Sequence, residues 1–135
     1  MLLRVAVAGL LVGHGFIHLG FVSPRPAPAP GAPPWPFDMT RSWLLNAIGA
    51  PESAARAIGW ALVAVLLVAF GIAALASLEW LPAGWFGPAS VVGAAASLVL
   101  LATSFHLWLV VGVAIDLVLL WGVIVAGWAP GPAAD

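Results

Sequence analysis

Four titratable side chains lie inside or beside long apolar runs of this sequence: His14, His18, His106 and Asp116. Histidine gains and loses a proton near neutral pH and also binds metal ions, and an aspartate removed from water gains affinity for a proton. His14 and His18 stand four residues apart in "GHGFIHLGF", so a helix would place both imidazoles on one face. These residue types at this spacing indicate proton transfer or metal ligation.

The composition places these side chains in a lipid environment. The chain has 135 residues, of which 64% are hydrophobic and 7% charged, and its mean hydropathy is +1.15. A soluble domain carries about 25% charged residues, so this surface suits lipid better than water. The lack of cysteine excludes disulfides, thiolate zinc sites and iron–sulfur clusters, and the net charge of -1 provides no basic surface for nucleic acid.

Several segments are long and apolar enough to cross a bilayer, which takes about 20 residues per helix. Backbone groups in lipid must bond within their own segment, so helices are expected. The first segment resembles a secretory signal peptide, but its two histidines and the prolines that follow argue against cleavage. The sequence therefore predicts an all-α integral membrane four-transmembrane-helix bundle, a single domain over 1–135, with helices at about 2–22, 57–78, 88–106 and 113–128 and a turn near 105–112.

A long Pro-rich loop, 23–56, separates the first two predicted helices. Proline fixes φ and removes the backbone donor, so the stretch "SPRPAPAPGAPPWPF" should be extended. The stretch 43–48 then places its apolar residues on one helical face, which predicts a short interfacial helix that ends at Gly49 or Pro51. A loop of this length with this aromatic and apolar content is typical of a cover over the bundle end.

Small residues recur at four-residue spacing in three of the predicted helices, a pattern that lets helix backbones approach closely. The high Ala and Gly content of the chain explains the same pattern without close packing. The residues concerned are Gly9 and Gly13, then Ala69, Ala73 and Ser77, then Gly93 and Ser97.

The alternating direction of successive helices should gather the titratable residues at the loop end of the bundle. His14 and His18 lie near the end of the first helix, His106 ends the third, and Asp116 opens the fourth. Each has a simpler explanation: a neutral histidine bonded to another helix, an imidazole at the interface, or an acid favoured by a helix dipole. Because ionisable residues are costly in lipid and usually face the bundle interior, their shared placement predicts one convergent site.

The order of these motifs resembles the DoxX-like family of small bacterial four-helix membrane proteins. The stretch "LLRVAVAGLLVGHGFIHLGF" contains Arg4, the His14–Gly15 pair and the polar His18, and further along the chain His106 precedes Asp116. The resemblance covers the four helices but not the loop, and the acid often found in the family's second helix is missing here. It implies a membrane subunit that is linked, in some members, to quinone or sulfur-compound redox chemistry.

Three functions fit these observations. The first is an enzyme or redox-enzyme subunit that acts on a lipophilic small molecule, quinone- or isoprenoid-like, and uses these side chains for proton transfer. The second is a metal- or haem-binding membrane protein, in which His14 and His18 would be metal ligands completed by His106 and Asp116. The third is a non-catalytic accessory subunit whose loop contacts other subunits or a second copy of the chain.

Ion or drug transport is less well supported by the sequence. A proton-coupled exporter usually needs an acid at mid-membrane, and Asp116 is expected near one end of its helix. The abundance of Ala, Gly and Pro, with Arg in place of Lys, is typical of GC-rich bacterial genomes. We therefore expect a multi-pass protein of the bacterial cytoplasmic (inner) membrane in direct contact with the lipid bilayer, whose orientation the few arginines leave open.

Overall fold

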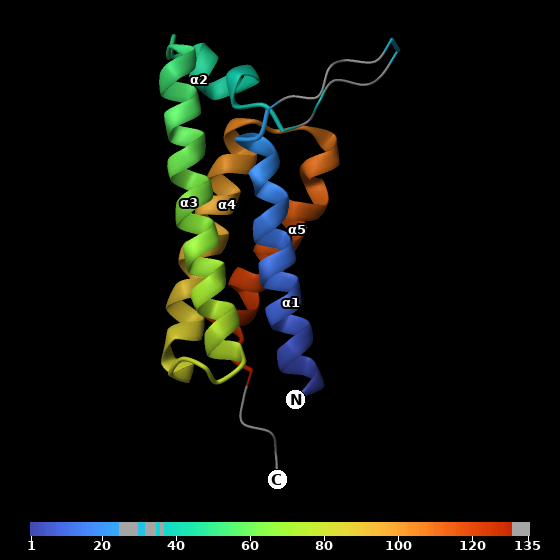
Figure 1. Ribbon diagram of the computed structural model, residues 1–135, viewed down its shortest axis with the longest axis vertical. Coiled ribbons are helices and arrows are strands. Elements are labelled where there is room, and N and C mark those ends of the chain that lie inside the picture. The colour runs from blue at the N-terminus through green and yellow to red at the C-terminus, as the bar shows by residue number, and fades with distance from the viewer. Residues whose placement is uncertain (25–29, 32–34, 36, 131–135) are drawn as a thin grey trace.

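The chain folds into an all-α bundle. The computed structural model describes residues 1–24, 30–31, 35 and 37–130. In chain order its elements are α1 (Leu2–Ile17), the 3₁₀ turns η1 (His18–Phe21) and η2 (Met39–Arg41), α2 (Trp43–Ala47), α3 (Glu52–Ser77), the 3₁₀ turn η3 (Ala83–Trp85), α4 (Phe86–Thr103), the 3₁₀ turn η4 (Leu107–Leu109), α5 (Val110–Leu120) and the π-helical turn η5 (Trp121–Val125) (Figure 1).

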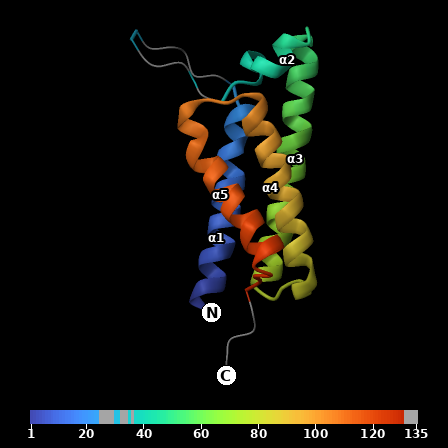
Figure 2. The same ribbon diagram turned by 180° about the vertical axis from the view of Figure 1, so that it is seen from behind.

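Four long helices form the bundle, and within the described residues four stretches are long and apolar enough to span a membrane. The stretches are Leu2–Phe21, Glu52–Ser77, Ala83–Thr103 and Leu107–Val125, and they confirm the predicted fold class. α3 packs between α1 and α4, and α5 packs mainly on α4, which it crosses obliquely (Figure 2). The amino terminus lies at one end, and α2 lies at the other, called the loop end below (Figure 1).

The helix limits differ from the predicted ones where short polar segments stop or start a helix. α3 begins at Glu52 instead of 57, because Pro51 precedes it in extended conformation and Arg56 Nε donates to Glu52 Oε1 across the first turn (3.1 Å). The turn after α4 occupies 104–106, and η4 and α5 follow it without a break, so the turn is shorter and earlier than the predicted 105–112.

This earlier turn changes the depth of Asp116. Asp116 is the tenth residue of the 19-residue span Leu107–Val125, so it lies near mid-membrane. The prediction that it opens the last helix is therefore wrong, and with it the simpler explanation of an acid favoured by the helix dipole. The helix starts several residues earlier because the His106 side chain accepts a hydrogen bond from the Trp108 backbone N–H and caps η4.

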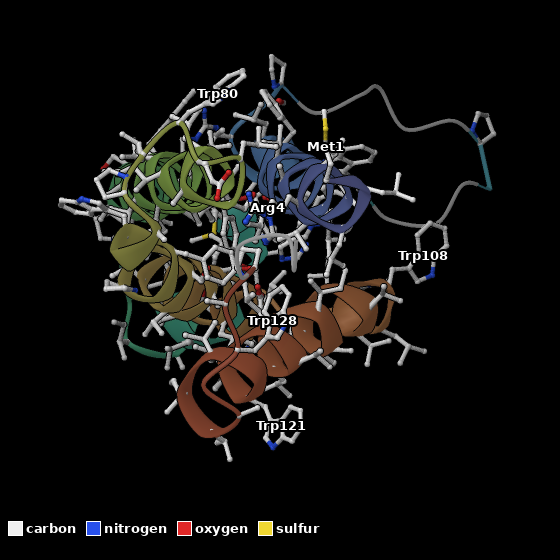
Figure 3. The ribbon with its side chains drawn as sticks, turned by 90° about the horizontal axis from the view of Figure 1, so that it is seen from below. Met1, Arg4, Trp80, Trp108, Trp121 and Trp128 are labelled. Atoms are coloured by element: carbon white, nitrogen blue, oxygen red, sulfur yellow. The ribbon has the colours of Figure 1, made fainter. Side chains whose placement is uncertain are left out.

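An ion pair joins α1 to the end of α3, opposite the loop end. Glu79 has a φ of 63°, in the left-handed region that costs a non-glycine residue roughly 1–2 kcal/mol. This conformation ends α3 and directs the carboxylate to Arg4, with 2.5 Å between Glu79 Oε2 and Arg4 Nη1. Viewed along the bundle, Arg4 lies among the helices while Trp80 and Trp108 point outward (Figure 3). Exposed tryptophans near helix ends suit the lipid–water interface.

The small residues divide into those that pack and those that do not. Gly9 and Gly13 are exposed, and a Cβ at either position would meet nothing within 4 Å, so at this pair the spacing does not mark close packing within the bundle. Gly93 does pack: a Cβ there would lie 2.6 Å from the ring of Phe70. Phe70 in turn contacts the imidazole of His14, with 5.6 Å between ring centroids. Gly93 therefore makes room for the ring that supports His14.

The second half of the long loop covers the loop end. The Ser42 hydroxyl donates to the Thr103 carbonyl (2.5 Å), and Trp43 Nε1 donates to the Ala102 carbonyl (2.6 Å). These bonds satisfy carbonyls at the end of α4 that have no helical partner. Only Leu45 of the predicted apolar face of α2 is buried, and much of the Pro-rich stretch lies outside the described residues.

We predict that Gly93→Ala destabilises the protein, because the added methyl group would overlap the buried ring of Phe70. Overpacking of this kind costs about 1–3 kcal/mol. The matched control is Gly71→Ala on α3, where a Cβ meets nothing within 4 Å. Thermal unfolding of the purified proteins in detergent should give a lower midpoint for Gly93→Ala and an unchanged or higher midpoint for Gly71→Ala. Equal midpoints would contradict the packing described for Phe70.

Candidate functional site

A closed network of four hydrogen bonds joins α1, η1, α4 and α5 in the bundle interior. His14 Nε2 lies 2.9 Å from Asp116 Oδ1, and the Ser97 hydroxyl lies 2.5 Å from Asp116 Oδ2. The same hydroxyl lies 2.8 Å from His18 Nε2, and His18 Nδ1 lies 2.8 Å from the His14 carbonyl oxygen. The network thus runs from a side chain of α1 through α5 and α4 and back to the backbone of α1.

All members of this network are buried in the bundle. His14 is 5% exposed and His18 2%, and Ser97 and Asp116 are fully buried. Among the residues of α5, all of which are described, Asp116 is the buried one, although it is also the only charged one. A carboxyl group in lipid without partners would be very costly, so α5 turns its apolar side chains outward and its carboxyl group inward.

The network unites three of the predicted site residues and leaves one outside. His14, His18 and Asp116 converge, as their shared face and placement indicated. His106 instead bonds the Trp108 backbone N–H at 3.2 Å and stacks edge-on with the Trp108 ring. Sequence reasoning noted Ser97 only as a small residue. Its spacing from Gly93 is compatible with close helix packing, but nothing in the local sequence shows that its hydroxyl bonds Asp116.

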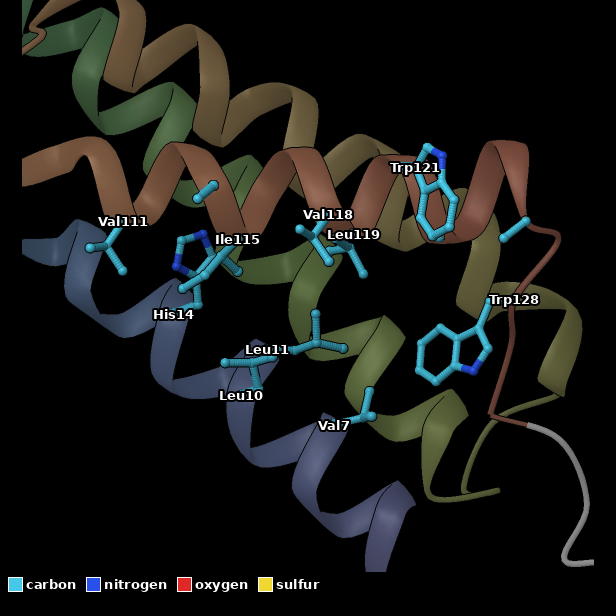
Figure 4. A pocket seen from close by; sticks show the side chains of 13 residues that line it. Val7, Leu10, Leu11, His14, Val111, Ile115, Val118, Leu119, Trp121 and Trp128 are labelled. Atoms are coloured by element: carbon cyan, nitrogen blue, oxygen red, sulfur yellow. The ribbon is translucent and has the colours of Figure 1, made fainter.

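A largely apolar groove of about 590 Å³ lies between α1 and the α5–η5 segment. Figure 4 shows the two helices diverging from His14 toward Val7 and Trp128. His14 is the titratable residue in the lining, and the rest of the wall is almost wholly apolar. The apolar lining includes Val7, Leu10, Leu11, Ile115, Leu119 and Trp128.

A second, smaller cavity of about 140 Å³ lies on the loop side of the same imidazole. The groove and this cavity share His14, Val111 and Ile115, so the His14 ring stands at their junction. His18 and Phe37 also line the smaller cavity. Phe37 belongs to the covering loop and packs on η1, since a Cβ on Gly20 would lie 2.9 Å from its ring. The loop therefore closes this cavity at the loop end of the bundle.

The geometry does not favour a metal site in the described part of the chain, where no group of three or more His, Cys, Asp or Glu side chains could hold a metal ion. The rings of His14 and His18 stand nearly perpendicular, at 86°, with centroids 4.9 Å apart. Both nitrogens of His18 and Nε2 of His14 already take part in hydrogen bonds. A shared metal would require the network to break.

The fold and the site together define a small multi-pass membrane protein with buried His14–Asp116 and His18–Ser97 polar contacts. No protein-family model matches the sequence, and neither the curated proteins nor the solved structures contain a match.

Two buried serines of α4 offer a matched test of the network. Ser97→Ala removes a hydroxyl that serves both Asp116 and His18, so it should lower the free energy of unfolding by about 1–2 kcal/mol. Ser90→Ala removes a fully buried hydroxyl that has no hydrogen-bond partner in the described part of the chain, so it should be neutral or stabilising. Unfolding midpoints in detergent compare the two. If Ser97→Ala is as harmless as Ser90→Ala, the hydroxyl does not bridge these groups.

Proposed function

We propose that this protein is an enzyme, or a subunit of a redox enzyme, of the bacterial inner membrane that acts on a quinone- or isoprenoid-like molecule. The molecule would lie in the groove between α1 and α5 and exchange a proton with His14. One observation carries the proposal: His14 lines an apolar groove and at the same time bonds the fully buried Asp116.

The groove suits such a ligand in size, lining and position. Its volume of about 590 Å³ falls within the range of roughly 300–1,000 Å³ that small-molecule sites occupy. Its wall offers little to a polar ligand except the imidazole at its inner end. Because it lies between two spanning helices whose outer side chains are exposed, a lipophilic molecule could enter from the bilayer without crossing water.

The chemistry follows from the pairing of an imidazole with a carboxyl group. Asp116 fixes the orientation of the His14 ring and stabilises the charge that the ring acquires when it accepts a proton. Ser97 bonds the other carboxyl oxygen, and His18 in turn bonds the Ser97 hydroxyl. His106 takes no part in this proposal, because its ring caps η4.

Membership of the DoxX-like family belongs to the same proposal. Two features support it: the described part of the chain has four spanning stretches, and Arg4, His14 and His18 lie in the first of them and Asp116 in the fourth. A quinone-type ligand agrees with the redox chemistry of some members of that family.

Proton-coupled transport is a second candidate, and the depth of Asp116 favours it. A proton-coupled exporter usually needs an acid at mid-membrane. Asp116 lies at the middle of its spanning stretch, whereas the predicted helix limits had placed it near one end. Purified protein in liposomes loaded with a pH-sensitive dye separates the two functions, since a transporter would move protons with its cargo and an enzyme would not.

The groove is tested by filling it. Ala114 lines the groove, so Ala114→Phe should weaken ligand binding at least tenfold by occupying the volume. Ala64→Phe is the control, because Ala64 lines a different apolar depression, between α3 and α4. The probes are decylubiquinone and decylubiquinol, and the readout is the saturable quenching of tryptophan fluorescence, since Trp121 and Trp128 flank the groove. Equal effects of the two variants, or no saturable quenching by either probe, would refute the proposal.

A further inference from the structure

We infer that the ligand of the groove is a lipophile with a hydroxyl group, such as a phenol, a hydroquinone or a long-chain alcohol, and that this hydroxyl donates a hydrogen bond to His14 Nδ1. The inference rests on the proposed function and specifies its substrate class. It comes from counting the protons that the network requires.

Two protons in the network are fixed by chemistry. The His14 backbone oxygen can only accept, so His18 Nδ1 must carry a proton and donate it. The Ser97 hydroxyl has one proton but takes part in two bonds, one with Asp116 Oδ2 and one with His18 Nε2. It can donate in only one of them, so the partner in the other bond must donate to the serine oxygen.

This leaves two ways to satisfy all four bonds without net charge. In the first, Ser97 donates to an ionised Asp116, and a doubly protonated His18 donates to Ser97. In the second, Asp116 is protonated on Oδ2 and donates to Ser97, and Ser97 donates to a neutral His18. The two arrangements contain the same number of protons and differ by the shift of two protons along the same bonds.

Both arrangements impose the same state on His14. The Asp116 Oδ1 atom must accept in each, so His14 Nε2 carries a proton and, for zero net charge, Nδ1 carries none. The alternative, in which Oδ1 holds the proton and His14 Nε2 accepts it, completes all four bonds only with a net positive charge. A net charge inside the membrane is costly, so the resting site presents Nδ1 as a hydrogen-bond acceptor.

Nδ1 is also the atom that a ligand can reach. It has no hydrogen-bond partner among the described residues. It is not fully enclosed either, because among those residues the fully enclosed side-chain atom without a partner is Ser90 Oγ. The His14 ring stands at the junction of the groove and the smaller loop-side cavity. A ligand whose chain fills the groove can therefore place its polar head beside the imidazole.

The network also allows the proton to move on. When the ligand O–H bond breaks and its proton binds Nδ1, His14 becomes a cation and the ligand an anion. In the second arrangement, Asp116 then passes its proton to Ser97, Ser97 passes its own to His18 Nε2, and His14 Nε2 gives its proton to Asp116 Oδ1. The positive charge has then moved from His14 to His18, with no proton gained or lost within the network. Ser97 is the positioning residue that makes this transfer possible.

A pair of probes that differ only in the donor tests the inference. The purified protein in detergent is titrated with 4-octylphenol and with its methyl ether, 4-octylanisole, and binding is followed by tryptophan fluorescence. One hydrogen bond in an apolar groove is worth about tenfold in affinity, so the phenol should bind about tenfold more tightly. In His14→Leu this preference should disappear while binding of the ether persists.

The outcomes separate the inference from the proposed function. Equal binding of the two probes, abolished by Ala114→Phe, would overturn the inference and leave the groove as a lipophile site. Binding of neither probe, together with no binding of the quinone probes, would overturn both.

A second measurement does not depend on variants: ¹⁵N NMR of the histidine-labelled protein should show His14 unprotonated at Nδ1 and protonated at Nε2. The opposite tautomer would contradict the proton count.

Discussion

A carboxyl group placed near the middle of a membrane dictates much of this structure. Asp116 is the charged residue of an otherwise apolar helix, and its burial sets the rotation of α5 about its own axis. Its two oxygens need two partners, which His14 supplies from α1 and Ser97 supplies from α4. Three helices are thus held together at one level by polar contacts in a bundle whose remaining contacts are mostly apolar.

The groove follows from the same arrangement. α5 packs along α4, but the hydrogen bond at His14 is the polar contact that holds it to α1 in the described part of the chain. Away from that contact the two helices diverge, and the space between them is lined by apolar side chains as far as Trp128 (Figure 4). The polar network and the groove therefore share His14, because the imidazole that bonds Asp116 also forms the inner end of the groove.

The sequence predicted features that depend on local pattern. Four apolar stretches of spanning length specify four helices, and the spacing of His14 and His18 placed both imidazoles inward. The depth of Asp116 was missed because it depends on where the turn at 104–106 lies, which is set by a cap from His106. Ser97 was missed because a serine in a helix rich in Ala and Gly resembles any other small residue.

Gly9, Gly13 and Gly93 have the same local pattern, and only the partner helix decides that Gly93 packs. The groove depends on the angle between α1 and α5, which no local pattern encodes.

The most direct test of the central role of Asp116 is a double-mutant cycle with His14. Unfolding free energies are measured in detergent for the wild type, His14→Leu, Asp116→Leu and the double variant, since leucine suits an apolar helix at both positions. Each single variant leaves one polar partner buried without its bond, whereas the double variant removes both. We predict that the double variant is more stable than the sum of the single effects implies, by at least about 1 kcal/mol. Additive costs, with a coupling energy near zero, would contradict it.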